Sequence, residues 1–231
     1  MSYPDDCLQC LADNWWEKAD SKELTRGALV YAHVQFFSEI PIELVPERET
    51  AYGHDRVIVK ARPLYGRSSQ PASVLPVAAF PRLAGADCYL VNRAKRRPCV
   101  VIGEIQRPLI SRTLTKGMGK HQTAPFVAIA PYYGVEQKYR AGYNPEFVER
   151  VRHAAYPQWM WDVLPHSKKE SILRLDQIQP MGIHHQAYEH TGFKLSDEAL
   201  MLFDEHLYWL LNGEMGEELT LMKELIKETE E

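Results

Sequence analysis

Prolines are concentrated between residues 38 and 88, which contain Pro41, Pro46, Pro63, Pro71, Pro76 and Pro81. Because proline has no backbone N–H, it occurs in sheets only at edges, bulges or the first residue of a strand. This segment is therefore a poor source of central strands, although the alternating run 56–61 is able to form an edge strand. We interpret residues 38–88 as a long insertion after the first strand, not as a second domain.

Four runs outside the insertion predict the strands of a core. Residues 26–34 contain a β-rich run after Gly27, and residues 99–103 and 126–130 are continuous apolar runs of buried-strand length. Residues 171–178 alternate between polar and apolar side chains over part of their length, which predicts a fourth strand. The fold class that follows is α+β with a mainly β core.

Helices are predicted near both ends of the chain and before the last strand. Asn144-Pro145-Glu146 combines a cap residue, a proline at the first helical position and an early acid. Ser196 precedes apolar residues at helical spacing, which predicts a helix over 196–212, and a second, acidic helix follows from about 216 to 227. The predicted organisation is an arm or helix at 1–20, one domain at 21–212 that includes the insertion, and an acidic helix at 213–231.

Charge is distributed unevenly along the chain. The net charge is −4, but residues 196–231 hold eleven Asp or Glu against two Lys or Arg, whereas residues 82–120 hold nine Lys or Arg against two acids. A basic segment of this kind is typical of proteins that bind a phosphate backbone. The alternative is that these cations only solvate the surface. Residues 214–231 would be able to screen a basic groove in cis, but a plain solvated helix is the preferred explanation of the acidic end.

The composition also restricts the compartment and the cofactors. No apolar run reaches the length of a membrane span, and the N-terminus lacks the pattern of a secretory signal, so we expect a cytoplasmic protein without membrane contact. Cys7 and Cys10 have the spacing of half a zinc site, which His184, His185 and His190 would have to complete; an incidental pair on a helix is the alternative. We predict neither a metal nor another cofactor.

Three ordered strings resemble the PemK/MazF family of toxin ribonucleases. They are Arg26-Gly27-Ala-Leu-Val-Tyr, Arg97-Pro98-Cys-Val-Val-Ile and Ser171-Ile-Leu-Arg-Leu-Asp-Gln-Ile, and the predicted helix at 196–212 lies where the family has its closing helix. The resemblance covers roughly half of the chain. It implies a small SH3-like barrel, a homodimer, a possible antitoxin partner, and cleavage of single-stranded RNA without a metal.

The chain departs from the family pattern in two places. The short loop between the first two strands is replaced by the insertion, and the histidine that some members carry there has no counterpart. Where many members have a threonine after the third strand, this chain has Pro131, Tyr132 and Tyr133. These departures leave a second hypothesis open, namely a catalytically inactive SH3-like module that binds nucleic acid or a protein.

The predicted catalytic residues are Asp176, Arg174 and Arg97. Metal-free RNA cleavage needs a base for the ribose 2′-hydroxyl and positive charge beside the phosphate. A period of two puts Arg174 and Asp176 on one strand face, where Asp176 would be the base and Arg174 a charge stabiliser, since a guanidinium hardly ever loses its proton. Arg97 matches the family's phosphate-binding arginine; a surface ion pair is the alternative for Arg174 and Asp176.

Further RNA-binding residues are expected in the basic segment and after the third strand. They are Arg93, Lys95, Arg96, Arg107, Lys120, His121, Tyr132 and Tyr133. The tyrosines would stack on bases. The proton donor for the leaving oxygen is expected among His54, His121 and Tyr132.

Overall fold

The computed structural model describes residues 3–19, 24–47, 58–64, 88–103, 116–117, 126–136, 142–184 and 186–229. The chain divides into two compact units, one made of Met1–His33 with Arg96–Glu231 and the other of Val34–Lys95. The second unit is longer at both ends than the predicted insertion at 38–88. Its boundaries with the first unit fall within strands β2 (Ala28–Gln35) and β6 (Ala94–Val101).

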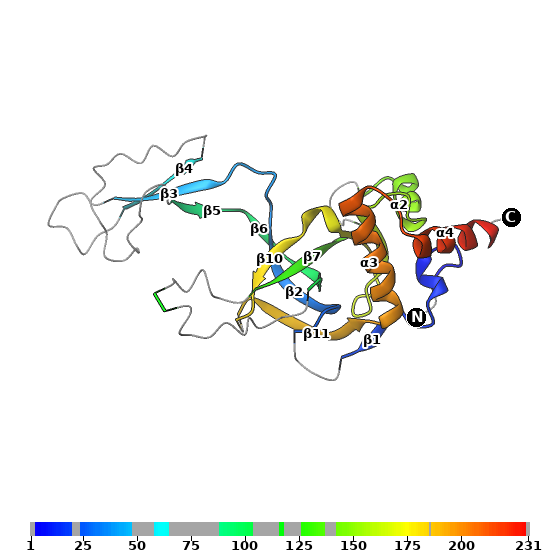
Figure 1. Ribbon diagram of the computed structural model, residues 1–231. Coiled ribbons are helices and arrows are strands. Elements are labelled where there is room, and N and C mark those ends of the chain that lie inside the picture. The colour runs from blue at the N-terminus through cyan, green and yellow to red at the C-terminus, as the bar shows by residue number, and fades with distance from the viewer. Residues whose placement is uncertain are drawn as a thin grey trace. The chain divides into compact units, whose positions relative to one another are not determined.

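The first unit is built on a mainly antiparallel sheet (Figure 1). The strand order is β1-β11-β2-β6-β7-β9-β8, and β10 pairs with β7 beside this path. The strands not yet given are β1 (Trp16–Lys18), β7 (Phe126–Gly134), β8 (Trp159–Val163), β9 (Glu170–Arg174), β10 (Gln179–Gly182) and β11 (Tyr188–Leu195). The long strand β7 pairs with β10 and β6 through its first part and with β9 through its last residues, Tyr132 to Gly134.

The fold is therefore α+β with a mainly β core, as predicted, but the described strands do not form a closed barrel, and the SH3-like identification stays a prediction. Among the described strands, the order begins at β1 and ends at β8 without returning to its start. Helices cover the apolar surface that a barrel would enclose: Leu202 and Phe203 of one helix and Leu219 of another are buried with sheet residues such as Val100 in the main core. Burial by helices removes the need for the sheet to close on itself.

Three α-helices are present in the described part of the chain. They are α2 (Pro145–Arg152), α3 (Asp197–Asn212) and α4 (Glu217–Thr229), and a short 3-10 turn, η1 (Leu8–Leu11), lies in the N-terminal segment. The Asn144 side chain accepts a hydrogen bond from the Glu146 N–H at 2.9 Å, and the Ser196 hydroxyl accepts one from the Ala199 N–H at 3.1 Å. Both caps satisfy N–H groups that the helix itself leaves free.

The C-terminal helix α4 packs firmly on the rest of the first unit. Leu219 and Ile226 are buried in the main core, and the Lys223 ammonium donates a hydrogen bond to the Ala154 carbonyl at 2.9 Å. The helix is thus a structural element, and its exposed residues include Leu221 and Leu225 as well as glutamates. None of the described helices is long and apolar enough to cross a membrane.

The second unit contains a three-stranded antiparallel sheet of order β4-β3-β5, with β3 at Ile42–Glu47, β4 at Ile58–Pro63 and β5 at Tyr89–Val91. Strand β4 lies at an edge and overlaps the predicted edge strand at 56–61. Pro46 lies in the central strand, but β5 pairs only with residues 42–44 of that strand, so the proline removes no hydrogen bond from the β3–β5 ladder. The buried Glu43 pairs with Arg62, with 2.8 Å between Oε2 and Nε.

Candidate nucleic-acid site

Two arginines of the first unit lie against one tyrosine ring. The Arg97 guanidinium carbon is 3.7 Å from the centroid of the Tyr133 ring, and the Arg174 guanidinium carbon is 5.5 Å from the same centroid. Arg97 comes from β6 and Tyr133 from the adjacent strand β7, while Arg174 ends β9 on the other side of β7. Cation–π attraction by the ring offsets part of the repulsion between the two like charges.

Asp176 completes this cluster through Arg174. The Arg174 Nε and Nη2 atoms donate to the two carboxylate oxygens of Asp176 at 2.7 and 2.6 Å, a bidentate pair. Strand β9 ends at Arg174, and a 3-10 turn at Leu175–Gln177 brings Asp176 back beside it. The predicted strand over 171–178 is therefore too long, and the turn, not strand alternation, brings the two side chains together.

Both members of the pair keep part of their side chains in contact with solvent, 20% for Arg174 and 31% for Asp176. Hydrogen bonding to Asp176 raises the pKa of Arg174 above its ordinary value, so the guanidinium stays charged. The Tyr133 hydroxyl donates to the Gln177 side-chain oxygen, which fixes the ring beneath the arginines. We call Arg97, Tyr133, Arg174, Asp176 and Gln177 the arginine–tyrosine site.

Aromatic side chains continue the surface beyond Arg174. Trp159 lies opposite Arg174 in the β8–β9 register, and the Arg174 guanidinium carbon is 5.6 Å from the Trp159 ring. Phe147 of α2 contacts Trp159 edge-on at 4.9 Å between ring centroids and stacks on Tyr143 at 5.5 Å. After Asp176, Tyr143 also helps to raise the pKa of Arg174 above its ordinary value. The sequence marked neither Tyr143 nor Phe147 for function, because only the fold brings α2 next to β8.

Arg96, the neighbour of Arg97, belongs to a different cluster. Its guanidinium carbon lies 4.5 Å from the Tyr31 ring, and it forms an ion pair with Glu189. The Tyr31 hydroxyl is 2.6 Å from His166 Nε2, and burial lowers the pKa of His166, which favours the neutral imidazole. Consecutive strand residues point to opposite faces, so Arg96 is directed away from the arginine–tyrosine site. His166 was not predicted, and no pattern around it in the sequence indicates this contact.

The remaining predicted residues are distributed as follows. Arg93 and Lys95 belong to the second unit, where Arg93 pairs with Glu39 at 2.9 Å and lies over the Phe36 ring. His54, Arg107, Lys120 and His121 lie outside the described residues.

Tyr132 is a correction. It is 2% exposed, and its hydroxyl donates to Asp162 Oδ2 at 2.8 Å. Burial raises its pKa well above the ordinary value, and the hydrogen bond to Asp162 acts in the same direction. The predictions that Tyr132 stacks on a base or donates a proton to the leaving oxygen are wrong for this buried ring. In the alternating strand β7 it points into the main core, whereas Tyr133 points to the opposite face.

Asp162 itself is a buried carboxylate that the sequence did not predict. It is 1% exposed, and it also accepts hydrogen bonds from the Tyr3 hydroxyl at 3.1 Å and the Trp16 indole N–H at 3.3 Å. Burial raises its pKa to about 6, while the hydrogen bonds from its partners oppose this shift. Because Tyr3 and Trp16 belong to the N-terminal segment, Asp162 ties that segment to β8.

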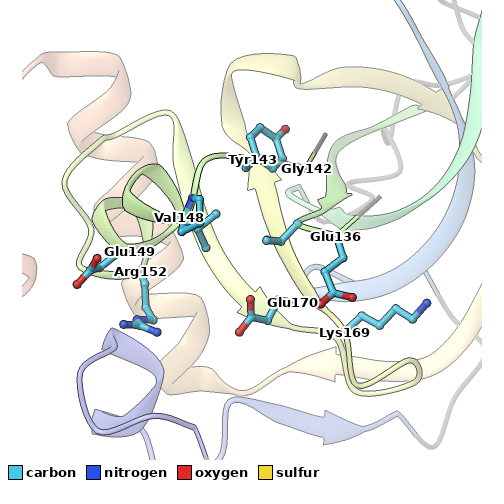
Figure 2. A pocket seen from close by; sticks show the side chains of 10 residues that line it. Glu136, Gly142, Tyr143, Val148, Glu149, Arg152, Lys169 and Glu170 are labelled. Atoms are coloured by element: carbon cyan, nitrogen blue, oxygen red, sulfur yellow. The ribbon is translucent and has the colours of Figure 1, made fainter. Parts of the chain in front are cut away.

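A pocket of about 780 Å³ lies beside the arginine–tyrosine site (Figure 2). It is lined by the residues that follow β7, by Tyr143 and helix α2, and by the start of β9. Tyr143 thus lines the pocket and, through Phe147 and Trp159, is linked to Arg174 of the arginine–tyrosine site.

The described residues contain no group of three or more His, Cys, Asp or Glu side chains that could hold a metal ion. The thiols of Cys7 and Cys10 hydrogen-bond to the carbonyls of Pro4 at 3.1 Å and Asp5 at 3.2 Å. Burial raises the pKa of Cys7 to about 12, which disfavours the thiolate that a zinc ion would need. These contacts agree with a structural role for the cysteine pair.

Comparisons of the chain with protein-family models, with curated proteins and with solved structures find no match.

Proposed function

We propose that this protein is a metal-independent endoribonuclease, resembling the PemK/MazF toxins, that cleaves single-stranded RNA by attack of a ribose 2′-hydroxyl. The observation that carries the proposal is the arginine–tyrosine site: two guanidinium groups and a carboxylate held together on a partly exposed surface. These are the groups that phosphodiester cleavage without a metal requires.

In the proposed reaction, Asp176 takes the proton of the 2′-hydroxyl as the 2′-oxygen attacks phosphorus. Arg97 and Arg174 stabilise the additional negative charge on the phosphorane, for which their planar, always-charged guanidinium groups are suited. The bond from phosphorus to the 5′-oxygen then breaks, and that oxygen accepts a proton. The products are a 2′,3′-cyclic phosphate and a 5′-hydroxyl. His54 and His121 remain the candidate proton donors.

The bidentate Arg174–Asp176 pair sets a condition on this mechanism. Both carboxylate oxygens accept from Arg174, so a substrate phosphate competes with Asp176 for the same guanidinium. We expect Arg174 to turn toward the phosphate when RNA binds, which frees the carboxylate to act as a base. Arg97 offers a second guanidinium to the phosphate, because it lies on the same Tyr133 ring as Arg174.

The second hypothesis is a module that binds RNA or a protein without cleaving it. It is favoured by the same bidentate pair, because an aspartate held by both oxygens is well suited to positioning an arginine. The exposed aromatic and guanidinium groups suit binding as well as catalysis. Homodimer formation, an antitoxin partner and a cytoplasmic location remain predictions that accompany the first hypothesis.

The deciding experiment incubates a mixed-sequence single-stranded RNA with the protein in EDTA and maps the fragment ends. We expect cleavage by the wild type, with cyclic phosphate ends, and a loss of roughly 10²–10⁴-fold in Asp176→Asn and about 10²–10³-fold in Arg174→Ala. Lys194→Ala is the matched control, because it also removes an exposed charge from an ion pair, with Glu17. RNA binding without cleavage by the folded wild type would support the binding module instead.

A further inference from the structure

The pocket beside Tyr143 lies on the same sheet face as the arginine–tyrosine site. Glu170, Ile172 and Arg174 alternate along β9 and so share one face, and Tyr133 of β7 lies opposite Ile172. Glu170 lines the pocket and Arg174 belongs to the site. Four residues of strand separate them by about 13 Å. An RNA strand with one phosphate on Arg174 therefore reaches the pocket within a few nucleotides.

The pocket walls offer an apolar floor and a rim of hydrogen-bond acceptors. Val135, Val148 and Tyr143 form apolar surface, and the lining carboxylates are those of Glu136 after β7, Glu149 on α2 and Glu170 at the start of β9 (Figure 2). None of these three carboxylates forms an ion pair within the described part of the chain. The volume of about 780 Å³ is in the range of small-molecule sites.

The cations at the pocket are not equivalent. Arg152 is already engaged by Asp6 at the N-terminal segment. Lys169 precedes Glu170 and, among the described residues, has no acidic partner, so it is available for a phosphate at the rim. The pocket thus combines one available cation with three acceptors. A ligand that fits this pattern carries its negative charge at one end and hydrogen-bond donors at the other.

We propose that the pocket binds an unstacked nucleobase that carries an exocyclic amino group, from the same RNA strand that occupies the arginine–tyrosine site. Cytosine, adenine and guanine each present an amino donor that a glutamate accepts, whereas uracil presents a carbonyl oxygen at the position of the cytosine amino group. The site therefore selects against uracil. This inference rests on the proposed function, because it assumes that RNA is the ligand.

Cytidine and uridine 5′-monophosphate are a matched pair of probes, because they differ only at C4 and N3 of the ring: cytosine has an amino group and an acceptor nitrogen where uracil has a carbonyl and an N–H. We expect cytidine monophosphate to shift the NMR signals of Val135, Tyr143 and Val148, with an affinity about tenfold above that of uridine monophosphate, since a hydrogen bond to a charged group is worth this factor or more. Glu170→Gln should abolish the difference. Glu146→Gln should preserve it, because Glu146 lies on α2 and pairs with Arg150 instead of lining the pocket.

Equal affinities for the two nucleotides would overturn the proposal. Changes in NMR signals confined to Arg97 and Tyr133 would overturn it as well. Changes in the NMR signals of the pocket residues on addition of argininamide, but on addition of neither nucleotide, would also overturn it. They would indicate that the pocket binds a basic side chain of a protein partner. The titration needs no cleavage. If the protein prefers cytidine monophosphate but leaves RNA intact, the nucleobase pocket is supported and the ribonuclease proposal is refuted. If the protein cleaves RNA without this preference, the ribonuclease proposal is supported and the nucleobase pocket is refuted.

Discussion

The buried carboxylate of Asp162 makes the stability of the protein depend on pH in an unusual direction. Its pKa is raised to about 6 in the folded protein, whereas the ordinary value is 3.8. Folding therefore favours the protonated form. The stability linked to that proton is fully present below pH 3.8 and is lost as the pH rises through about 6. Most exposed, ion-paired carboxylates contribute in the opposite sense.

The size of the effect follows from the shift. Roughly two pKa units correspond to about 3 kcal/mol, of which about 2 kcal/mol is lost between pH 4 and pH 7.5, because the unfolded chain is already partly ionised at pH 4. Asp162→Asn removes the titrating group and keeps its shape. It also places an amide near the donors of Tyr3, Trp16 and Tyr132, which adds a constant cost but no dependence on pH.

The measurement is the free energy of unfolding in urea, at half-unit steps from pH 4 to pH 7.5, for the wild type and Asp162→Asn. We expect the wild-type value minus the variant value to fall by about 2 kcal/mol across this range. Asp13→Asn is the control, because it makes the same substitution at an exposed carboxylate; a pH dependence shared by both variants would not be due to the burial of Asp162. A flat difference for Asp162→Asn would refute the reasoning, since it would mean that Asp162 has the same pKa in the folded and unfolded chains.

Three further results are expected. Ser196→Ala removes the hydroxyl that caps α3 and should lower the free energy of unfolding by about 1 kcal/mol in urea, with an unchanged m-value. Phe203→Ala empties a site of the main core where the side chain is 0% exposed and should cost about 3–5 kcal/mol, or prevent folding; a loss below about 1 kcal/mol would contradict the described packing. Arg97→Ala should weaken RNA binding and reduce the slope of log affinity against log salt by about 0.7, the value for one single-strand phosphate contact, and an unchanged slope in a filter-binding assay would remove Arg97 from the phosphate contacts.

The helices and the strand runs could be predicted because their signals are local. Asn144 and Ser196 cap α2 and α3 as the sequence suggested, and the apolar runs at 99–103 and 126–130 became parts of β6 and β7. Closure of the sheet was not predictable in this way. It depends on whether helices or strands cover the core, and the apolar stripe of α3 is compatible with either arrangement.

In the candidate site too, features set by the local sequence could be predicted, whereas features set by the fold could not. Arg174 and Asp176 are close in sequence, so their pairing needed only a short turn, and Arg97 reaches them because β6 and β9 both flank β7. The exposure of Tyr132 and Tyr133 was harder to predict. Two adjacent tyrosines in a strand point to opposite faces, and only the position of the core decides which one is buried. Asp162 lies in an apolar run, and its partners Tyr3 and Trp16 come from the other end of the chain, so no local pattern indicated it.

The two ends of the second unit lie close together, and this matters for engineering the chain. The Phe36 N–H donates to the Arg93 carbonyl at 2.9 Å, and the Asn92 side chain donates to Gln35 at 3.1 Å. A segment whose entry and exit are this close can be lengthened, shortened or exchanged at a small entropic cost of loop closure. The segment between Phe36 and Arg93 can thus be replaced as one piece. A graft point at these two residues would let a binding peptide or a fluorescent domain be carried by the protein while the strands on either side keep their pairing.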